Sequence, residues 1–145
     1  MKEKFKRAYM QTAQTFAELS SARRLKVGAI VVKNDRIISI GYNGMPAGWD
    51  NNCEDEIVND QTVTLKTKPE VLHAETNAIA KLAKSNESGM GASMFITHAP
   101  CLNCAKLIYQ SGIGYVTYTH EYRDTAGINF LSASGVVIEH MPLVD

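Results

Sequence analysis

The second half of the chain alternates short β-branched runs with helical segments, and this order strongly constrains the fold. We predict strands near residues 92–97, 114–119 and 136–140, separated by helices near 101–110 and 124–134. Strands that alternate with helices pair in parallel through right-handed crossovers. The sequence therefore predicts an α/β protein whose binding crevices lie at the carboxyl ends of the strands.

The first half contains different elements. Residues 3–21 carry apolar side chains three and four positions apart, which predicts an amphipathic helix. The runs VGAIVVK and RIISIGYN are separated by Asn34 and Asp35, so they are predicted to form an antiparallel hairpin. The segment 44–68 is polar and is predicted to be a long loop, followed by a helix over 72–85.

Length and charge limit the class of protein. A chain of 145 residues suits one domain, here residues 1–145, and we see no boundary within it. Fifteen basic residues balance fifteen acidic ones, so no global field attracts nucleic acid or a membrane surface. No apolar run is long enough to span a bilayer, and three cysteines suit a reducing compartment. We expect a soluble, cytoplasmic protein whose thiols are available to a metal.

Two short stretches, HAE at 73–75 and PCLNC at 100–104, carry the residues best suited to bind a metal. Each lies at the start of a predicted helix, where a histidine and two cysteines can converge and where the helix dipole lowers thiolate pKa values. Two thiolates and an imidazole favour zinc among common metals. The sequence predicts a zinc site formed by His73, Cys101 and Cys104.

The fourth coordination position decides what such a site does. A water molecule there makes the site catalytic, whereas a fourth protein ligand makes it structural. Cys53 is the candidate for closing the site, but it stands in a polar segment with no second ligand at metal spacing. Glu75 favours the catalytic interpretation, because a carboxylate beside a three-ligand zinc is what general acid/base catalysis needs.

The order HxE followed by PCxxC is the signature of zinc nucleobase deaminases. From about Leu25 to Gly135 the chain resembles the cytidine and deoxycytidylate deaminase superfamily, most closely the deoxycytidylate (dCMP) deaminases. The segments that carry the resemblance are KVGAIVVKNDRIISIGYNGMPAG, HAETNAI, THAPCLNCAK, QSGI and EYRDTAG. The resemblance implies a three-layer α/β/α cytidine-deaminase-like fold with a five-stranded mixed sheet.

The resemblance also implies an activity. His73, Cys101 and Cys104 would hold zinc, and Glu75 would carry protons to ring nitrogen 3 and to the leaving amine. The reaction would convert dCMP and water into dUMP and ammonia, supplying dUMP for thymidylate synthesis. Some family members hold a second, structural zinc, but of its ligands only Cys53 is evident in this sequence. We therefore expect one zinc per chain.

Substrate contacts are implied less directly. Asn43 of GYNG matches a family residue that contacts the nucleoside, and the backbone around Ala74 would approach the cytosine amine. A 5′ phosphate needs a local cation or N–H groups, since the chain has no net charge. Lys26, Tyr122 and Arg123 are the candidates for this contact, with Arg23 and Arg24 close to Lys26 in the sequence.

The remaining three histidines and the single tryptophan lie outside the two metal-binding motifs. His120 and His140 stand at strand ends and are expected at the surface, whereas His98 lies in a family-like THxPC context. Trp49 is expected to pack a loop or an interface rather than to stack on a base.

Family members are typically homohexamers activated by dCTP and inhibited by dTTP. The resemblance thus implies a homo-oligomer and a second nucleotide site, which would take Mg²⁺·dCTP. The long loop over 44–68 and its subunit interface would form this site. Its candidate residues are Asn43, Gly44, Met45, Pro46 and Gly48. The alternative is that this segment only covers the active site as a lid.

Two rival functions are open at this point. A tRNA adenosine deaminase or a single-strand cytosine deaminase would use the same zinc chemistry, but both should show a basic groove. A catalytically silent zinc module for structure or regulation is the alternative from another class, and the intact Glu75 argues against it.

Overall fold

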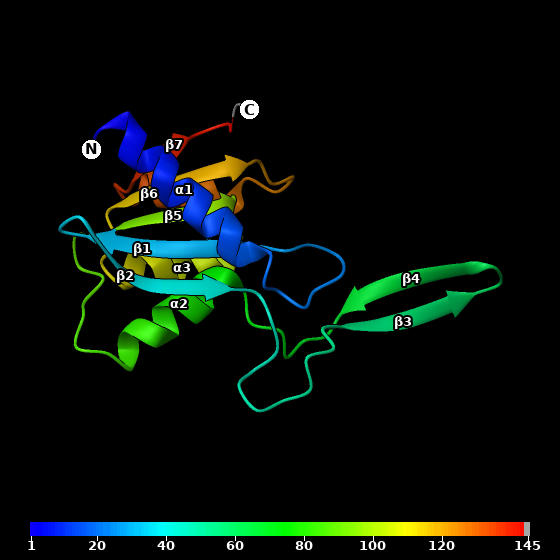
Figure 1. Cartoon of the computed structure of the whole chain (residues 1–145). Helices are drawn as coiled ribbons and strands as arrows, with labels where there is room; N and C mark the ends of the chain where they lie inside the picture. Colours follow the sequence, from blue (N-terminus) through cyan, green and yellow to red (C-terminus); the bar gives the residue numbers. More distant parts are fainter. Residues whose placement is uncertain (144–145) are drawn as a thin grey trace.

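A computed structural model of the protein describes residues 1–143, and its central element is a five-stranded mixed sheet (Figure 1). The strand order is β2-β1-β5-β6-β7, with β1 antiparallel to β2 and β5, and with β5, β6 and β7 parallel. The elements, in chain order, are α1 (Glu3–Ala17), β1 (Gly28–Lys33), β2 (Arg36–Tyr42), β3 (Glu54–Asn59), β4 (Thr62–Thr67), α2 (Ala74–Ala83), β5 (Ser93–His98), α3 (Leu102–Gln110), β6 (Tyr115–His120), α4 (Ala126–Ala133) and β7 (Val137–His140).

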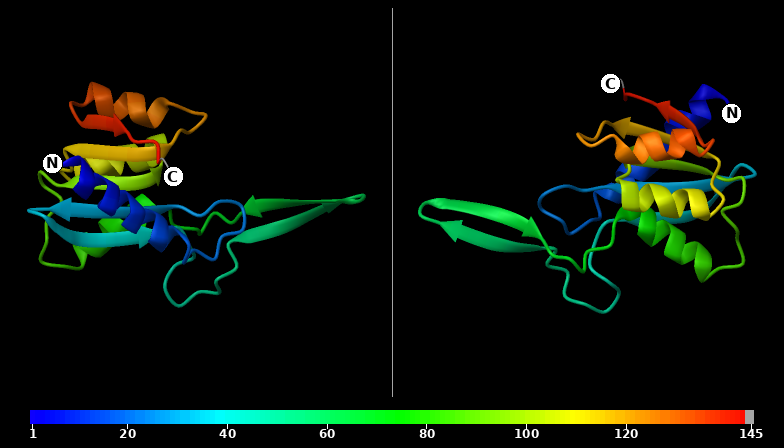
Figure 2. Two further views of the ribbon diagram at one scale, coloured as in Figure 1. Left: turned by 45° about the horizontal axis from the view of Figure 1, so that its top comes forward. Right: turned by 180° about the vertical axis from the view of Figure 1, so that it is seen from behind.

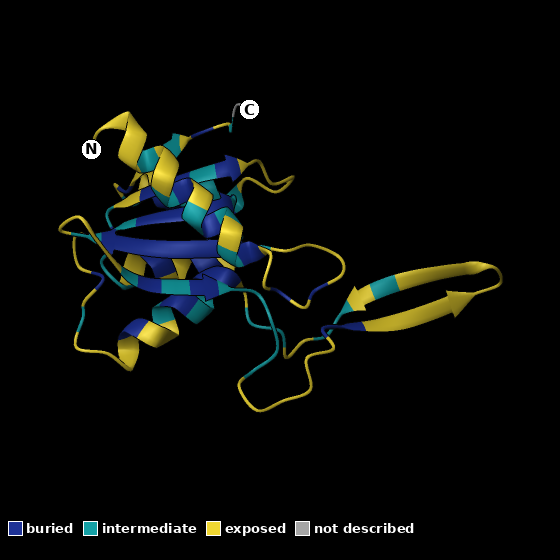
Figure 3. Ribbon diagram, viewed as in Figure 1, coloured by how far each residue is buried: buried dark blue, intermediate teal, exposed yellow. Residues whose placement is uncertain are grey.

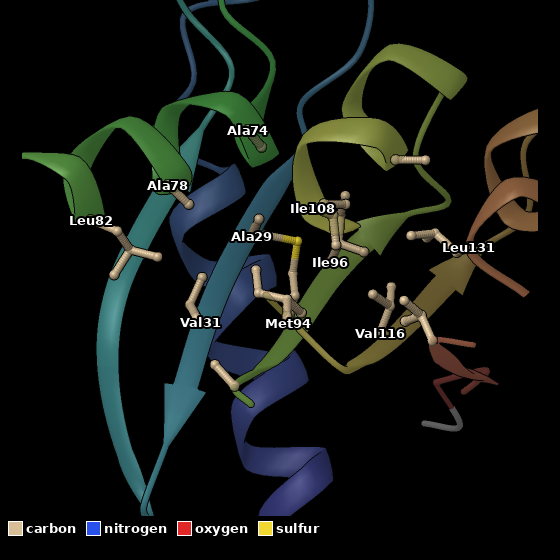
Figure 4. Packing of buried hydrophobic residues seen from close by; sticks show 14 residues of the cluster. Ala29, Val31, Ala74, Ala78, Leu82, Met94, Ile96, Ile108, Val116 and Leu131 are labelled. Atoms are coloured by element: carbon tan, nitrogen blue, oxygen red, sulfur yellow. The ribbon is translucent and has the colours of Figure 1, made fainter. Parts of the chain in front are cut away.

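Helices cover both faces of this sheet, as predicted. Alternate residues of a strand point to opposite faces, so β1 directs Ala29 and Val31 toward one core and Ile30 toward the other. The larger core lies under α2, α3 and α4 (Figure 4), which stand in a row when the molecule is seen from behind (Figure 2). The smaller core lies under α1. The predicted three-layer fold with a five-stranded mixed sheet is confirmed.

Two glycines allow the helices to lie close to the sheet. A Cβ on Gly28 would stand 2.0 Å from the Ala13 carbonyl oxygen of α1, and one on Gly41 would stand 2.3 Å from the Ala74 carbonyl oxygen of α2. Both contacts are with backbone atoms, so a side chain would force the helix to move. Gly41 therefore helps to set the position of the first turn of α2.

The prediction of a long loop over residues 44–68 is wrong. Strands β3 and β4 form a separate antiparallel hairpin within it, which projects from the body (Figures 1 and 3). Ile57, Val58 and Val63 supply β-branched residues on both sides of a turn in which Asp60 has a φ of 53°. The polar composition of the segment hid this pattern, because the hairpin is solvent-exposed along most of its length.

Other differences concern the ends of elements. The helix predicted over 3–21 ends at Ala17, and residues 18–27 lead to β1 without regular structure. None of the helices in residues 1–143 combines the length and apolar composition needed to cross a bilayer.

Candidate active site

The first turns of α2 and α3 meet at one point, where they bring His73, Cys101 and Cys104 together. His73 is the N-cap of α2 and Cys101 is the N-cap of α3, while Cys104 lies in the first turn of α3. Their potential ligand atoms all lie within 4.8 Å of one another. His73 Nδ1 is 3.1 Å from Cys104 Sγ and 3.7 Å from Cys101 Sγ. Helix starts therefore bring residues 28 positions apart into one cluster.

This cluster fits a zinc ion. Ligand bonds of about 2.0–2.3 Å in a tetrahedral site place donor atoms roughly 3.5 Å apart, close to the two distances that involve His73. One imidazole and two thiols are a donor set typical of zinc. Within residues 1–143 this is the one group of three or more such side chains close enough to share an ion.

The thiols of the cluster differ in acidity. Hydrogen bonds from the Cys104 thiol and from His73 lower the pKa of Cys101 to about 4. The pKa of Cys104 is raised, first by its hydrogen bond with Cys101 and then by burial. The hydrogen bond with Cys101 also raises the pKa of His73. The low pKa favours the thiolate form of Cys101, which is the form that binds a metal ion.

Glu75 lies beside this cluster in the first turn of α2. Its side chain is 4 % exposed, and burial raises its pKa to about 7, while a hydrogen bond from its own backbone N–H and the nearby His73 act in the opposite direction. A carboxyl group with a pKa near neutrality can both accept and return a proton. Glu75 is therefore placed and tuned for acid/base chemistry next to the metal-binding cluster.

The cluster opens onto a cavity of about 430 Å³. Its walls combine polar and apolar groups, as a nucleotide-sized ligand requires. The lining residues are Ala22, Arg24, Leu25, Val27, Asn43, Cys53, Glu54, Thr67, Val71, His73, Ala74, Glu75, His98, Ala99, Cys101 and Tyr122.

Asn43 and Ala74, two predicted substrate contacts, line this cavity. The Asn43 side chain accepts a hydrogen bond from the Val27 N–H at 2.8 Å and donates one to the Leu25 carbonyl oxygen at 2.8 Å. Both bonds tie Asn43 to the segment before β1, which forms one wall. Asn43 thus holds the wall in place, while Ala74 is fully buried at the start of α2.

Of the residues predicted to contact the phosphate, only some line the cavity. Tyr122 lines the cavity, whereas Lys26 and Arg123 are exposed and do not. Arg24 is the cavity-lining cation among the residues that the structure describes. Its guanidinium donates to Thr67 Oγ1 at 3.0 Å. The sequence prediction favoured Lys26 and named Arg24 only as a nearby cation, because a run of basic residues does not show which side chain faces a cavity.

The predicted effector residues extend from the cavity along the chain. Gly44 pairs with Leu72, just before His73, through hydrogen bonds of 3.1 and 2.8 Å. Met45 and Pro46 are half-buried and Gly48 is exposed, with a φ of 85°. None of these four lines the cavity.

Cys53 and Glu54 connect the projecting hairpin to the site. Cys53 is buried outside the metal-binding cluster, its thiol lies 3.5 Å from the Asn51 carbonyl oxygen, and burial raises its pKa. Glu54 is also buried and accepts hydrogen bonds from the backbone N–H groups of Arg23 and Arg24. Cys53 thus lines the cavity without belonging to the group of ligand atoms that lie within 4.8 Å of one another, and Glu54 attaches the hairpin to the cavity wall.

His98 is a lining residue that the sequence did not assign to the site. Its place at the carboxyl end of β5, three residues before Cys101, was the available signal. His120 and His140 are exposed, as predicted, and His140 Nε2 lies 2.8 Å from the Thr119 carbonyl oxygen. Trp49 is 57 % exposed.

Residues 3–120 match the family described as the cytidine and deoxycytidylate deaminase zinc-binding region. The chain belongs to the cytidine and deoxycytidylate deaminase family. This deaminase is 48% identical to a dCMP deaminase from the cyanophage S-TIM5, solved in complex with dCMP and dUMP; the match has a TM-score of 0.87 and covers 97% of this chain and 99% of that one.

Curated relatives of this deaminase agree with that match. The deoxycytidylate deaminase of Enterobacteria phage T4 is 32% identical over 169 residues, which cover 92% of this chain and 88% of the relative. ComE operon protein 2 of Bacillus subtilis (strain 168) is 34% identical over 139 residues, which cover 93% of this chain and 70% of the relative. The resemblance to dCMP deaminases is confirmed.

Proposed function

We propose that this deaminase converts dCMP and water into dUMP and ammonia. The observation that carries the proposal is a buried carboxyl group, Glu75, beside a His-Cys-Cys cluster at the wall of a cavity of about 430 Å³. The similarity to a protein solved with dCMP and dUMP supports the same substrate. The product would supply dUMP for thymidylate synthesis.

His73, Cys101 and Cys104 would hold one zinc ion. Bound there, zinc supplies Lewis acidity that makes a water molecule a nucleophile near neutral pH. Ala74, buried between His73 and Glu75, would place its backbone against the cytosine amine. The walls formed by Leu25, Val27 and Val71 would exclude bulk water from the ring.

Glu75 would move the protons of the reaction. It takes a proton from the attacking water as the water oxygen bonds to carbon 4, and it gives that proton to ring nitrogen 3. It then carries the remaining hydroxyl proton to the 4-amino group, the bond between carbon 4 and that nitrogen breaks, and ammonia leaves. The carboxyl group ends in its starting state, which a pKa near 7 favours.

The phosphate of dCMP would meet a cation at the cavity wall. Contact by Lys26 and Arg123 stays a prediction, and Arg24 and Tyr122 are the candidates that line the cavity. We expect Arg24→Ala to lower kcat/KM for dCMP by about ten- to a hundredfold, because a charge-assisted hydrogen bond contributes about 1.5–3 kcal/mol. Deoxycytidine, which lacks the phosphate, should be affected much less.

Lys26→Ala is the matched control for that variant. A larger loss of kcat/KM for dCMP with Lys26→Ala than with Arg24→Ala would assign the phosphate contact to Lys26. Equal losses on dCMP and deoxycytidine with Arg24→Ala would show that Arg24 acts by holding Thr67 and the hairpin instead.

A homohexamer regulated by nucleotides is the second part of the proposal. An isolated two-stranded hairpin is marginally stable in water, yet β3 and β4 expose Ile57, Val58 and Val63 by 41, 66 and 59 %. These residues would be covered in an oligomer. The backbone over Gly44–Gly48 would take Mg²⁺·dCTP as activator, with dTTP as inhibitor, and Asn43 would link that site to the cavity.

One purified preparation tests these statements. Ammonia release is measured with dCMP, cytidine, dCTP and a tRNA anticodon stem, and the mass of the assembly is measured by light scattering. Ammonia release from dCMP supports the proposed dCMP deaminase activity. Release from the tRNA stem alone supports a tRNA adenosine deaminase, and release from none of the substrates supports a catalytically silent zinc module.

The dependence of the rate on dCMP concentration tests regulation. A sigmoidal curve that becomes hyperbolic with dCTP and steeper with dTTP supports regulation. A hyperbola unaffected by either nucleotide supports a lid.

A further inference from the structure

His98 lines the cavity but has no part in the metal-binding cluster or in the proton transfers proposed above. It ends β5 and is the register partner of His120 in β6. The two imidazole rings pack against each other in a tilted arrangement, with centroids 4.7 Å apart and planes 34° apart. The half-buried ring is therefore held in one plane at the cavity wall.

A chain of hydrogen bonds determines which nitrogen of His98 carries a proton. The Gly28 backbone N–H donates to Thr97 Oγ1 at 3.2 Å, and Thr97 Oγ1 lies 2.8 Å from His98 Nδ1. Because a backbone amide can only donate, Thr97 Oγ1 accepts that bond and its own proton is free to bond with Nδ1. The opposite assignment would leave the hydroxyl proton of buried Thr97 without an acceptor. Nδ1 is the acceptor.

The remaining nitrogen of the ring is then a donor. Burial, and after it the neighbouring His120, lower the pKa of His98 to about 4, so the ring is neutral near pH 7. Its single proton lies on Nε2. No hydrogen bond from Nε2 to another group is found in residues 1–143, and Nε2 is not among the fully buried unpaired atoms. A cavity-lining residue thus carries an N–H group that is available to a ligand.

We propose that His98 is a specificity-determining residue that donates its Nε2–H to an oxygen of the bound nucleotide. The inference rests on the proposed function. The 4-amino group of cytosine is itself a donor, so the partner is an acceptor: a phosphate oxygen or the pyrimidine carbonyl oxygen. Arg24 and Tyr122, which line the same cavity, also offer donors, and this set suits an oxygen-rich ligand.

Two amide variants separate this role from a structural one. The side-chain nitrogen of glutamine reaches the place of imidazole Nε2, whereas that of asparagine matches Nδ1. We expect His98→Gln to keep kcat/KM for dCMP within about twofold and His98→Asn to lower it by about three- to tenfold, the effect of one neutral hydrogen bond. His140→Asn, outside the cavity, is the control and should match wild type.

The proposal would be overturned if His98→Asn kept kcat/KM for dCMP while His98→Gln lowered it. That result would mean that activity depends on the contact with Thr97 and not on a donor at Nε2. Equal losses in both variants would overturn it as well. Comparison of dCMP with deoxycytidine identifies the oxygen: a loss confined to dCMP assigns the contact to the phosphate, and a loss on both assigns it to the pyrimidine carbonyl. Either pattern supports the donor role.

A measurement without substrate tests the tautomer directly. ¹⁵N–¹H correlation spectra of the zinc-loaded protein should show His98 protonated at Nε2 alone near pH 7, with the signals assigned by their loss in His98→Gln. Protonation at Nδ1 would contradict the proposal. Failure of wild-type enzyme to release ammonia from dCMP would reject the proposed function instead, so the two failures are distinguishable.

Discussion

Replacement of Glu75 by glutamine is expected to lower turnover of dCMP by about 10²–10⁴-fold or more, the range for one positioned acid/base group, while zinc content stays near that of wild type. The physical reason is that Glu75 moves protons at more than one step, whereas the ion is held by His73, Cys101 and Cys104. Glutamine has nearly the same shape but cannot accept a proton. Initial rates and metal analysis on the same samples measure both quantities.

Glu70→Gln is the matched control, since Glu70 is exposed and does not line the cavity. It should resemble wild type in rate and in zinc content. Retained activity in Glu75→Gln would remove Glu75 from the mechanism. Loss of zinc along with activity would mean that the carboxylate supports the metal rather than the proton transfers.

Replacement of Cys104 by serine is expected to reduce zinc from about one ion per chain to nearly none and to lower the thermal unfolding midpoint. Cys104 is 3 % exposed in the first turn of α3, and its Sγ lies 3.1 Å from His73 Nδ1. A serine hydroxyl is a poor zinc ligand, and loss of the ion removes the binding free energy that links α2 to α3. Metal analysis and thermal melts test this outcome.

Cys53→Ala is the control for removing a cysteine outside the cluster. Its zinc content should stay at about one ion per chain, even if the loss of a buried side chain lowers stability. Two zinc ions in the wild-type protein, with one lost in Cys53→Ala, would contradict the expectation of a single site. Full zinc retention in Cys104→Ser would contradict the assigned ligand.

Local sequence patterns were sufficient for most of the elements. The β-branched runs of β1 and β2 and the alternation from β5 to β7 predicted strands and helices whose order agrees with the structure. These patterns reflect short-range physics, since side-chain periodicity shows which faces can be buried. The hairpin formed by β3 and β4 was missed because its strands are exposed, so they lack the alternation that burial imposes.

The metal-binding cluster was also predictable from sequence, because its residues belong to two short motifs. His73 and Glu75 are two positions apart and converge only near a helix start, and the structure places His73 at the N-cap of α2. The CxxC spacing likewise places Cys101 at the N-cap and Cys104 in the first turn of α3. Short spacings of this kind depend on local backbone geometry, which the sequence largely determines.

The identity of the residues that form the cavity walls could not be predicted from the sequence, because it depends on tertiary structure. Whether Arg24 or Lys26 faces the ligand depends on how residues 22–27 are held by Asn43 and Glu54, which come from distant parts of the chain. The donor role proposed for His98 depends on Gly28 of a neighbouring strand. The sequence by itself determined most of the elements, the chemistry-bearing motifs and their family. The fold alone decided which side chains share the cavity, because burial and hydrogen bonding between remote segments set the orientation of each one.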